Sequence, residues 1–219
     1  MKQQVLVVGL GQFGMAAARA LSAGGVKVLA VDVDDNLVRL ASTFAAEAVR
    51  LDATDEEALA TTSPAQRNVC LCAIGHEARE ASIICTALLR QMGAKRVIAR
   101  ANDDVHARIL TLVGASVVVN PEREYGERFA NRIVYQDIRG EMALGEGLIV
   151  TEIDLPDDFA GQTLGELRLP VRFGVTVVAI RRSGSGQITS PGPESQLEQG
   201  DILVVVAKPG AVPRMIEGS

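Results

Sequence analysis

The first half of the chain alternates short apolar runs with longer segments of helical pattern. The apolar runs are rich in β-branched residues, as in strands covered on both faces. They lie at Val5–Val8, Val26–Val31, Ala48–Leu51, Val69–Ile74, Arg96–Ala99 and Val117–Val119. Helices are predicted between them, over Phe13–Ala23, Asn36–Ala46, Asp55–Thr61, Glu77–Met92 and Asp103–Val113. This pattern predicts an α/β fold, a Rossmann-like doubly wound parallel sheet, over residues 1–120.

A helix with an apolar stripe is predicted directly after the last strand. Asn120 is a favourable N-cap, Pro121 suits the first helical position and Glu122 favours the positive helix start. Apolar residues then recur at helical spacing, at Tyr125, Phe129, Ala130, Ile133 and Val134. Because the parallel sheet is already complete, we expect this crossover helix to leave the first domain and bury its stripe against a partner.

The last third of the chain has a different pattern. We interpret residues 137–147 as a linker, so that residues 121–147 form a crossover helix and linker. Strands are predicted at Leu148–Leu155, Val175–Ile180 and Ile202–Val206, with a short helix over Thr163–Leu169. Residues 148–219 are therefore predicted to form a small α+β C-terminal domain. Domains below about 70 to 80 residues seldom hold together on one core, so we expect association with a second copy.

Composition and charge narrow the class of protein. The net charge is -5 and no Lys/Arg cluster stands out, which argues against a nucleic-acid partner. Residues 1–10 lead directly into a predicted strand, unlike a signal peptide. No apolar stretch approaches the roughly 18 to 20 residues that cross a bilayer, so we expect a cytoplasmic protein. We interpret Cys70, Cys72 and Cys85 as small core residues in a reducing compartment.

A glycine motif between the first predicted strand and helix carries the strongest chemical signal. Gly9 permits the tight turn, Gly11 lets the backbone approach a pyrophosphate, and Gly14 lets the helix pack close to the sheet. The helix start then offers unpaired N–H groups to phosphate. Asp32 ends the second strand, where a carboxylate accepts hydrogen bonds from ribose hydroxyls and disfavours the 2′-phosphate of NADP. We predict a nucleotide site here.

Other strand ends should meet at the same edge of the sheet. Ligands of parallel sheets lie beyond the carboxyl ends of the strands. Three further segments and one histidine are therefore candidates for the nucleotide site. They are Asp52-Ala53-Thr54, Ala73-Ile74-Gly75-His76, Arg100-Ala101-Asn102 and His106.

Each of these residues also has a purely structural interpretation. Asp52 and Thr54 could instead cap the following helix, and Arg100 could form a surface ion pair. His76 could be a solvated loop residue, and His106 could be a structural residue, although its helix turn is expected to face the crevice. Glu122 either stabilises its helix dipole or contacts a metal or subunit beside the nucleotide.

Few side chains could carry out the proton transfer that a dehydrogenase needs. Tyr125 and Tyr135 lie on the outgoing helix, and no Lys follows the end of a strand in the sheet. We therefore favour a protein that senses its nucleotide and is not an enzyme. The alternative is a small NAD-dependent oxidoreductase with His76 or His106 as acid and base.

The sequence resembles a known family in several segments that follow one another along the chain. These are Val5–Gly14, Val28–Asp34, Asp52-Ala53-Thr54, Ala73-Ile74-Gly75, Val97–Asn102, Gly114–Glu122 and Gly200–Val206. The chain is similar to the cytoplasmic regulatory subunits of Ktr/Trk potassium-uptake systems, which join an RCK N-terminal domain to an RCK C-terminal domain.

The resemblance implies a homodimer that assembles into an octameric ring beneath a membrane-embedded potassium pore subunit, at the inner face of the plasma membrane. It implies ATP or ADP at the glycine loop, or NAD or NADH as in some members. It also implies Mg²⁺ or Ca²⁺ near Glu122, and cyclic di-AMP at the C-terminal domain near Val178, Ile180 and Arg181. The predicted nucleotide-binding residues are Gly9, Gly11, Gln12, Phe13, Gly14, Asp32, Asp52, Ala53, Ala73, Ile74, Gly75, Arg100, Ala101, Asn102, His106 and Glu122.

Gln12 departs from the family pattern. Many relatives carry Arg at this position, where it senses the terminal phosphate. Glutamine can still hydrogen-bond phosphate oxygens but brings no charge, so the preference between ATP and ADP is open. Arg100 could supply part of the missing charge.

Overall fold

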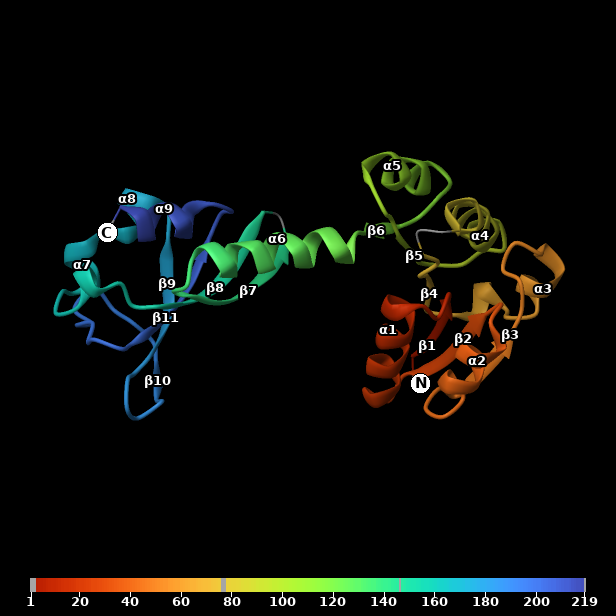
Figure 1. Ribbon diagram of the computed structural model, residues 1–219, viewed down its shortest axis with the longest axis horizontal. Coiled ribbons are helices and arrows are strands. Elements are labelled where there is room, and N and C mark those ends of the chain that lie inside the picture. The colour runs from red at the N-terminus through yellow and green to blue at the C-terminus, as the bar shows by residue number, and fades with distance from the viewer. Residues whose placement is uncertain (1–2, 76–77, 146, 219) are drawn as a thin grey trace. The chain divides into compact units, whose positions relative to one another are not determined.

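Two sheets organise the chain, one parallel and one antiparallel (Figure 1). The computed structural model describes residues 3–75, 78–145 and 147–218. The chain divides into two compact units, Met1–Glu124 and Tyr125–Ser219. The division falls inside the predicted crossover helix, so each unit is described by itself.

The first unit is a six-stranded parallel sheet with the order β3-β2-β1-β4-β5-β6. Its strands are β1 Gln4–Val8, β2 Lys27–Asp32, β3 Glu47–Arg50, β4 Val69–Cys72, β5 Val97–Arg100 and β6 Val117–Val119. Its helices are α1 Gln12–Ala23, α2 Asp35–Ala41, α3 Glu56–Ala60, α4 Arg79–Gln91 and α5 Asp104–Leu112, with a 3₁₀ turn at Pro64–Gln66. The predicted Rossmann-like topology is confirmed.

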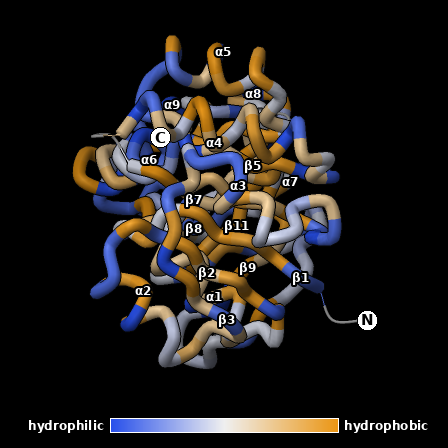
Figure 2. The backbone as a smooth tube through the Cα atoms, turned by 90° about the vertical axis from the view of Figure 1, so that its right-hand side faces the viewer, coloured by the Kyte–Doolittle hydropathy of each residue, from blue (hydrophilic) through white to orange (hydrophobic). Residues whose placement is uncertain are grey.

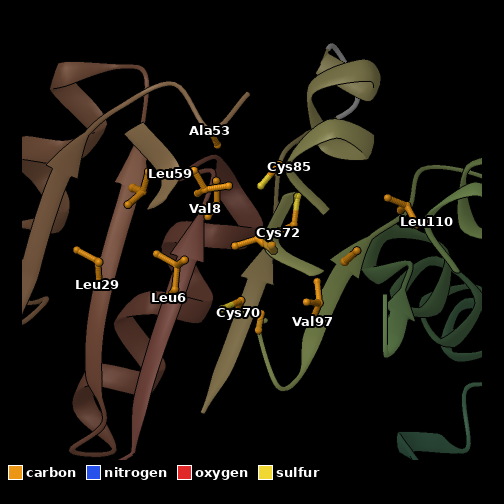
Figure 3. Packing of buried hydrophobic residues seen from close by; sticks show 14 of the residues in the cluster. Leu6, Val8, Leu29, Ala53, Leu59, Cys70, Cys72, Cys85, Val97 and Leu110 are labelled. Carbon is orange, nitrogen blue, oxygen red and sulfur yellow. The ribbon is translucent and has the colours of Figure 1, made fainter. Parts of the chain in front are cut away.

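Alternate strand residues serve two cores, one on each face of this sheet. On one face, the side chains of β1, β4 and β5 pack against α3, α4 and α5, as the residues labelled in Figure 3 show. On the other face, Val5, Val7 and Ala30 pack with Ala18 of α1 and Val38 of α2. Burial on both faces explains why β1 and β2 are mostly hydrophobic in Figure 2, apart from polar residues at their ends.

The three cysteines are all buried in the first of these cores, as predicted (Figure 3). Burial raises the pKa of the Cys70 thiol to about 11, although the nearby Arg67 acts in the opposite direction. These residues behave as small apolar side chains.

Helix α2 ends at Ala41, five residues before the predicted end at Ala46. The hydroxyl of Ser42 donates to the Arg39 carbonyl at 2.7 Å, and the hydroxyl of Thr43 donates to the Leu40 carbonyl at 2.7 Å. Side chains that bond to the backbone in this way compete with helical hydrogen bonds, and here they close the helix in a turn.

The second unit is a five-stranded antiparallel sheet with the order β10-β9-β11-β8-β7. Helix α6, Pro121–Val134, begins in the first unit and ends in this one. The remaining elements are β7 Ile138–Gly145, β8 Leu148–Asp154, a 3₁₀ turn at Asp157–Phe159, α7 Leu164–Leu167, α8 Leu169–Phe173, β9 Thr176–Arg181, β10 Ile188–Thr189, β11 Ile202–Ala207 and α9 Ala211–Glu217. The predicted α+β character is confirmed.

The linker predicted at residues 137–147 is instead part of this sheet. Residues 138–145 form β7, which pairs with β8, and the Ile138 side chain lies in the core. Gly145 and Gly147 adopt φ of 90° and 75°, conformations that glycine reaches without strain. Gly145 is the last residue of β7 and pairs with Leu148, the first residue of β8.

The described residues include no helix that is long and apolar enough to span a bilayer.

Candidate functional site

A cavity of about 210 Å³ opens at the carboxyl ends of the first four strands of the parallel sheet. Strands β1 and β4 are neighbours although they are not consecutive in sequence, so the cavity lies where the strand order reverses. Open parallel sheets bind their ligands at this point. Eight predicted residues line the cavity: Gly9, Gly11, Asp32, Asp52, Ala53, Ala73, Ile74 and Gly75.

The glycine loop is built by close backbone contacts. A Cβ on Gly14 would lie 1.8 Å from the Gly9 carbonyl oxygen, and Gly9 itself adopts a φ of 90°. Gly11 differs, because a Cβ there would meet no atom of the described residues within 4 Å. Gly11 is also the N-cap of α1 and has no side chain to satisfy the first N–H groups of that helix. The loop therefore offers open space and backbone donors, as an anion requires.

Asp32 joins the glycine loop to the end of β2. One carboxylate oxygen accepts a hydrogen bond from the Leu10 N–H at 2.5 Å, and the other accepts from the Asp34 N–H at 2.9 Å. Each carboxylate oxygen has two lone pairs, so acceptor capacity remains for a ligand hydroxyl. Asp32 thus holds the loop in place and presents oxygen atoms to the cavity.

Asp52 forms a local turn at the end of β3. Its Oδ1 accepts from the Thr54 N–H at 2.9 Å and from the Thr54 hydroxyl at 2.7 Å. These hydrogen bonds, the backbone one first, hold the pKa of Asp52 below its ordinary value. The alternative role as caps of α3 is wrong, because Asp55 is the N-cap and accepts from Glu57 and Ala58. Asp52 and Thr54 instead shape the wall of the cavity.

Arg100 lies beside Gly75 at the end of β5. Its guanidinium forms an ion pair with Glu122 and lies 6.0 Å from the centre of the Phe13 ring. A Cβ on Gly75 would lie 3.8 Å from the Arg100 Nη1 atom, so the arginine borders a cavity-lining residue. The ion pair that the sequence left as an alternative is therefore formed, and its partner is another predicted site residue.

His106 faces the core of the first unit and is completely buried. Its Nδ1 accepts a hydrogen bond from the Asn102 N–H at 3.3 Å, which joins the β5–α5 loop to the first turn of α5. The side-chain nitrogen of Asn102 is buried without a hydrogen-bond partner in the part of the chain that the structure describes. His76 lies outside the described residues.

Half of the predicted site residues do not line the cavity: Gln12, Phe13, Gly14, Arg100, Ala101, Asn102, His106 and Glu122. The described residues also contain no group of three or more His, Cys, Asp or Glu side chains placed to hold a metal ion. Glu122, the one residue predicted from the sequence to contact a metal, is paired with Arg100.

Sequence analysis missed several apolar residues of the cavity wall: Val8, Val33, Leu51, Ala78 and Ala81. Val33 and Leu51 each follow directly on the last residue of a strand, so the strand-end rule could have found them. Ala78 and Ala81 are three residues apart at the start of α4, a spacing that places them on one helix face.

The C-terminal unit holds the residues expected near cyclic di-AMP. Val178 is exposed, and Arg181 forms an ion pair with Glu152. Ile180 is completely buried in the core, so it does not face a ligand on the surface of this unit.

The apolar stripe of α6 is exposed, including Tyr125, Phe129, Ile133 and Val134. Tyr125 and Phe129 stack, with their ring centres 5.9 Å apart. Exposed aromatic residues in a row are typical of a surface that another molecule covers.

Two family models match this chain. The TrkA-N domain matches residues 5–121, and the TrkA-C domain matches residues 150–217. Ktr system potassium uptake protein C of Bacillus subtilis (strain 168) is 35% identical over 206 residues, which cover 94% of this chain and 92% of that protein. Ktr system potassium uptake protein A of Vibrio alginolyticus is 35% identical over 204 residues, 93% of this chain and 92% of that protein.

Solved structures share the fold. The GsuK RCK domain matches with a TM-score of 0.65 and 19% identity, over 99% of this chain and 47% of that chain. The GsuK channel bound to NAD matches with a TM-score of 0.65 and 20% identity, over 99% of this chain and 40% of that chain. This chain spans less than half of each of those proteins. From the two matching domains and the two relatives, the chain belongs to the family of Ktr system potassium uptake proteins, with a TrkA-N domain followed by a TrkA-C domain.

Proposed function

We propose that this protein is the nucleotide-binding regulatory subunit of a potassium-uptake system. The observation that carries the proposal is the cavity at the point where the strand order reverses, with open space at Gly11 and carboxylate acceptors at Asp32. Its relatives of similar length are named as potassium uptake proteins, which supplies the transport context.

An adenine nucleotide fits the chemistry of the cavity. Val33, Leu51 and Ala53 offer apolar contact to a base, Asp32 accepts from ribose hydroxyls, and the start of α1 faces phosphate. One GsuK structure is bound to NAD and another, with a TM-score of 0.51, is bound to ADP. We propose ATP or ADP as the ligand, with NAD or NADH as the alternative and Mg²⁺ or Ca²⁺ beside Glu122.

The Arg100–Glu122 ion pair offers a route from the site to helix α6. Glu122 lies in the first turn of α6, and Arg100 borders Gly75. A ligand shifts a conformational equilibrium only if it binds one state more tightly than the other. We propose that phosphate or a bound cation competes for this pair and thereby changes the position of α6.

The exposed apolar stripe of α6 is a surface through which a change in the position of α6 can reach another subunit. We propose that a second copy of the chain covers the stripe, that dimers assemble into an octameric ring, and that the ring acts on a membrane-embedded pore subunit. A cyclic di-AMP site on the C-terminal unit remains a prediction, now limited to Val178 and Arg181.

A thermal-shift panel with ATP, ADP, NADH and cyclic di-AMP, with and without Mg²⁺, tests the proposal. A ligand at a hundredfold excess over its Kd stabilises the native state by about 2.7 kcal/mol. We expect ATP or ADP to raise the unfolding temperature of the wild type more than that of Asp32→Asn, with Asp35→Asn as the exposed control. If no adenine nucleotide shifts the wild type, the proposed ligand is wrong.

Glu122→Ala tests the route to α6. We expect it to change both ATP affinity and the activation of potassium uptake. If neither changes, the Arg100–Glu122 pair is not the route.

A further inference from the structure

A second arginine stands beside the cavity and has no role in the site as described so far. Arg79 is the first residue of α4, and it lies between Ala78 and Ala81, both of which line the cavity. Its guanidinium forms an ion pair with Asp103, the N-cap of α5. Arg79 therefore joins the start of α4 to the start of α5, and its neighbours in the chain, though not Arg79 itself, line the cavity.

This ion pair is weak enough to exchange. The Arg79 and Asp103 side chains are 39% and 45% exposed, and ion pairs that water can reach contribute little to stability. Arg100 is different, because its side chain is only 13% exposed and it lies over the Phe13 ring. Of these two arginines, Arg79 is the one whose charge is more available to a ligand.

Asp103 remains anchored without Arg79. Its Oδ1 accepts from the His106 N–H at 2.8 Å, and this hydrogen bond is the main reason why the pKa of Asp103 lies below its ordinary value. The carboxylate is therefore ionised at neutral pH whether or not Arg79 is bound to it, and it can release the arginine without losing its own place.

The glycine loop has no positively charged side chain of its own to bind additional phosphates. Its donors are backbone N–H groups, and the side chain at the start of α1 is the neutral Gln12. Each phosphate beyond the first adds negative charge, and guanidinium binds phosphate through two parallel hydrogen bonds. A neutral loop can hold one phosphate, but it does not by itself favour a longer polyphosphate.

We infer that Arg79 sets the preference of this site for nucleotides with more than one phosphate. In the free protein Asp103 holds Arg79, and in the complex the distal phosphates replace Asp103 as its partner. This inference rests on the proposed nucleotide site, and it adds the residue that selects among nucleotides.

Calorimetric titration of the full chain with AMP, ADP and ATP tests the inference. We expect Arg79→Gln to weaken ATP and ADP binding by about tenfold or more, the effect of a lost charge-assisted hydrogen bond, and to leave AMP within about twofold. Arg39→Gln is the matched control, since Arg39 forms an exposed ion pair with Asp35 inside α2.

Asp103→Asn provides a test in the opposite direction. Asparagine is as good an N-cap as aspartate, so α5 keeps its cap while the competing charge is lost. We expect several-fold tighter ATP binding, and we expect Arg79→Gln in the same chain to abolish the gain. Unchanged unfolding temperatures of both single variants would exclude a folding defect.

The outcomes separate the two proposals. If the wild type binds ATP and Arg79→Gln binds it equally well, or loses AMP affinity to the same extent, the inference fails and the nucleotide site stands. If Asp103→Asn binds ATP no more tightly than the wild type, the competition is wrong. If the wild type binds no nucleotide, the proposed function fails and the role of Arg79 fails with it.

Discussion

Two aspartates, one in each unit, show how the same side chain serves different purposes. Asp201 directly precedes β11, is completely buried and accepts from the Arg182 guanidinium at 2.7 Å. It also accepts from the N–H groups of Ser183 at 2.9 Å and Glu198 at 3.0 Å. Asp32 ends β2, borders the cavity and accepts from two backbone N–H groups.

The two carboxylates differ in how much charge and hydrogen-bond acceptor capacity the protein leaves unmatched. The charge of Asp201 is matched by Arg182 and its oxygens are enclosed, so this residue holds together the turn before β11. No lysine or arginine of the described residues forms an ion pair with Asp32. A carboxylate that keeps acceptor capacity and faces a cavity can bind a ligand, whereas one that is fully matched and buried serves the fold.

Asp201→Ala should have the largest effect on stability. It leaves the N–H groups of Ser183 and Glu198 without this acceptor, and it leaves Arg182 with the Gln196 carbonyl but without its carboxylate partner. Losing one partner of a buried ion pair typically costs about 3–5 kcal/mol. Urea unfolding measures this cost. Asp154→Ala is the control in the same sheet, because its ion pair with Arg139 is exposed and is worth at most about 1 kcal/mol. Equal costs would remove the structural role that we assign to Asp201.

Gly14→Ala should have the next largest effect, on the loop that Asp32 holds. The new Cβ would approach the Gly9 carbonyl oxygen to 1.8 Å, so the backbone must move, at a cost of about 1–3 kcal/mol. Gly11→Ala meets no such contact and should lose less stability, only what alanine costs at an N-cap, yet its methyl group intrudes on the space for phosphate. Thermal unfolding and ATP titration of both variants separate packing from binding. A Gly11→Ala variant as unstable as Gly14→Ala would contradict the open space at Gly11.

Asp32→Asn should affect ligand binding more than stability, whereas substitution of Asp201 should affect mainly stability. One of the two backbone hydrogen bonds loses its acceptor, which costs about 0.5–1.5 kcal/mol of stability. Nucleotide affinity should fall by about tenfold or more, because the amide replaces one of the oxygens that accept from ribose. Paired unfolding and titration measurements test this. A large loss of stability with unchanged affinity would make Asp32 structural, like Asp201.

Acid should reveal the structural role of Asp201 through a smaller effect. Burial by itself raises the pKa of Asp201, but the hydrogen bonds from Glu198 and Ser183 and the charge of Arg182 outweigh it and lower the pKa. A lowered native pKa stabilises the fold above the unfolded value of about 3.9, and this stability is lost as the pH falls through the native pKa. Unfolding free energies between about pH 5 and pH 2 should therefore fall less steeply in Asp201→Asn than in the wild type. Parallel curves would contradict the assignment.

Much of the fold was predictable, because strands buried on both faces must be apolar throughout. The strands of the first sheet, their order along the chain and the glycine loop follow from this pattern. The linker predicted at residues 137–147 was wrong because residues 138–145 form a strand by pairing with β8, and the sequence pattern of one strand does not reveal its pairing partner. Half of the predicted site residues line the cavity, and several of the others pair among themselves instead, as Arg100 does with Glu122 and Asn102 with His106.

By itself, the sequence determined the local features of this protein: apolar runs, helix starts, and glycines where the backbone comes close to itself. These depend on neighbours in the chain and on the absence of a side chain. The tertiary structure alone decided the partners of each charge. Asp32 and Asp201 both lie at the end of an apolar strand. Asp201 forms an ion pair with Arg182, whereas Asp32 borders an open cavity. Arg79 and Asp103 stand 24 residues apart and pair only because β4 and β5 lie side by side.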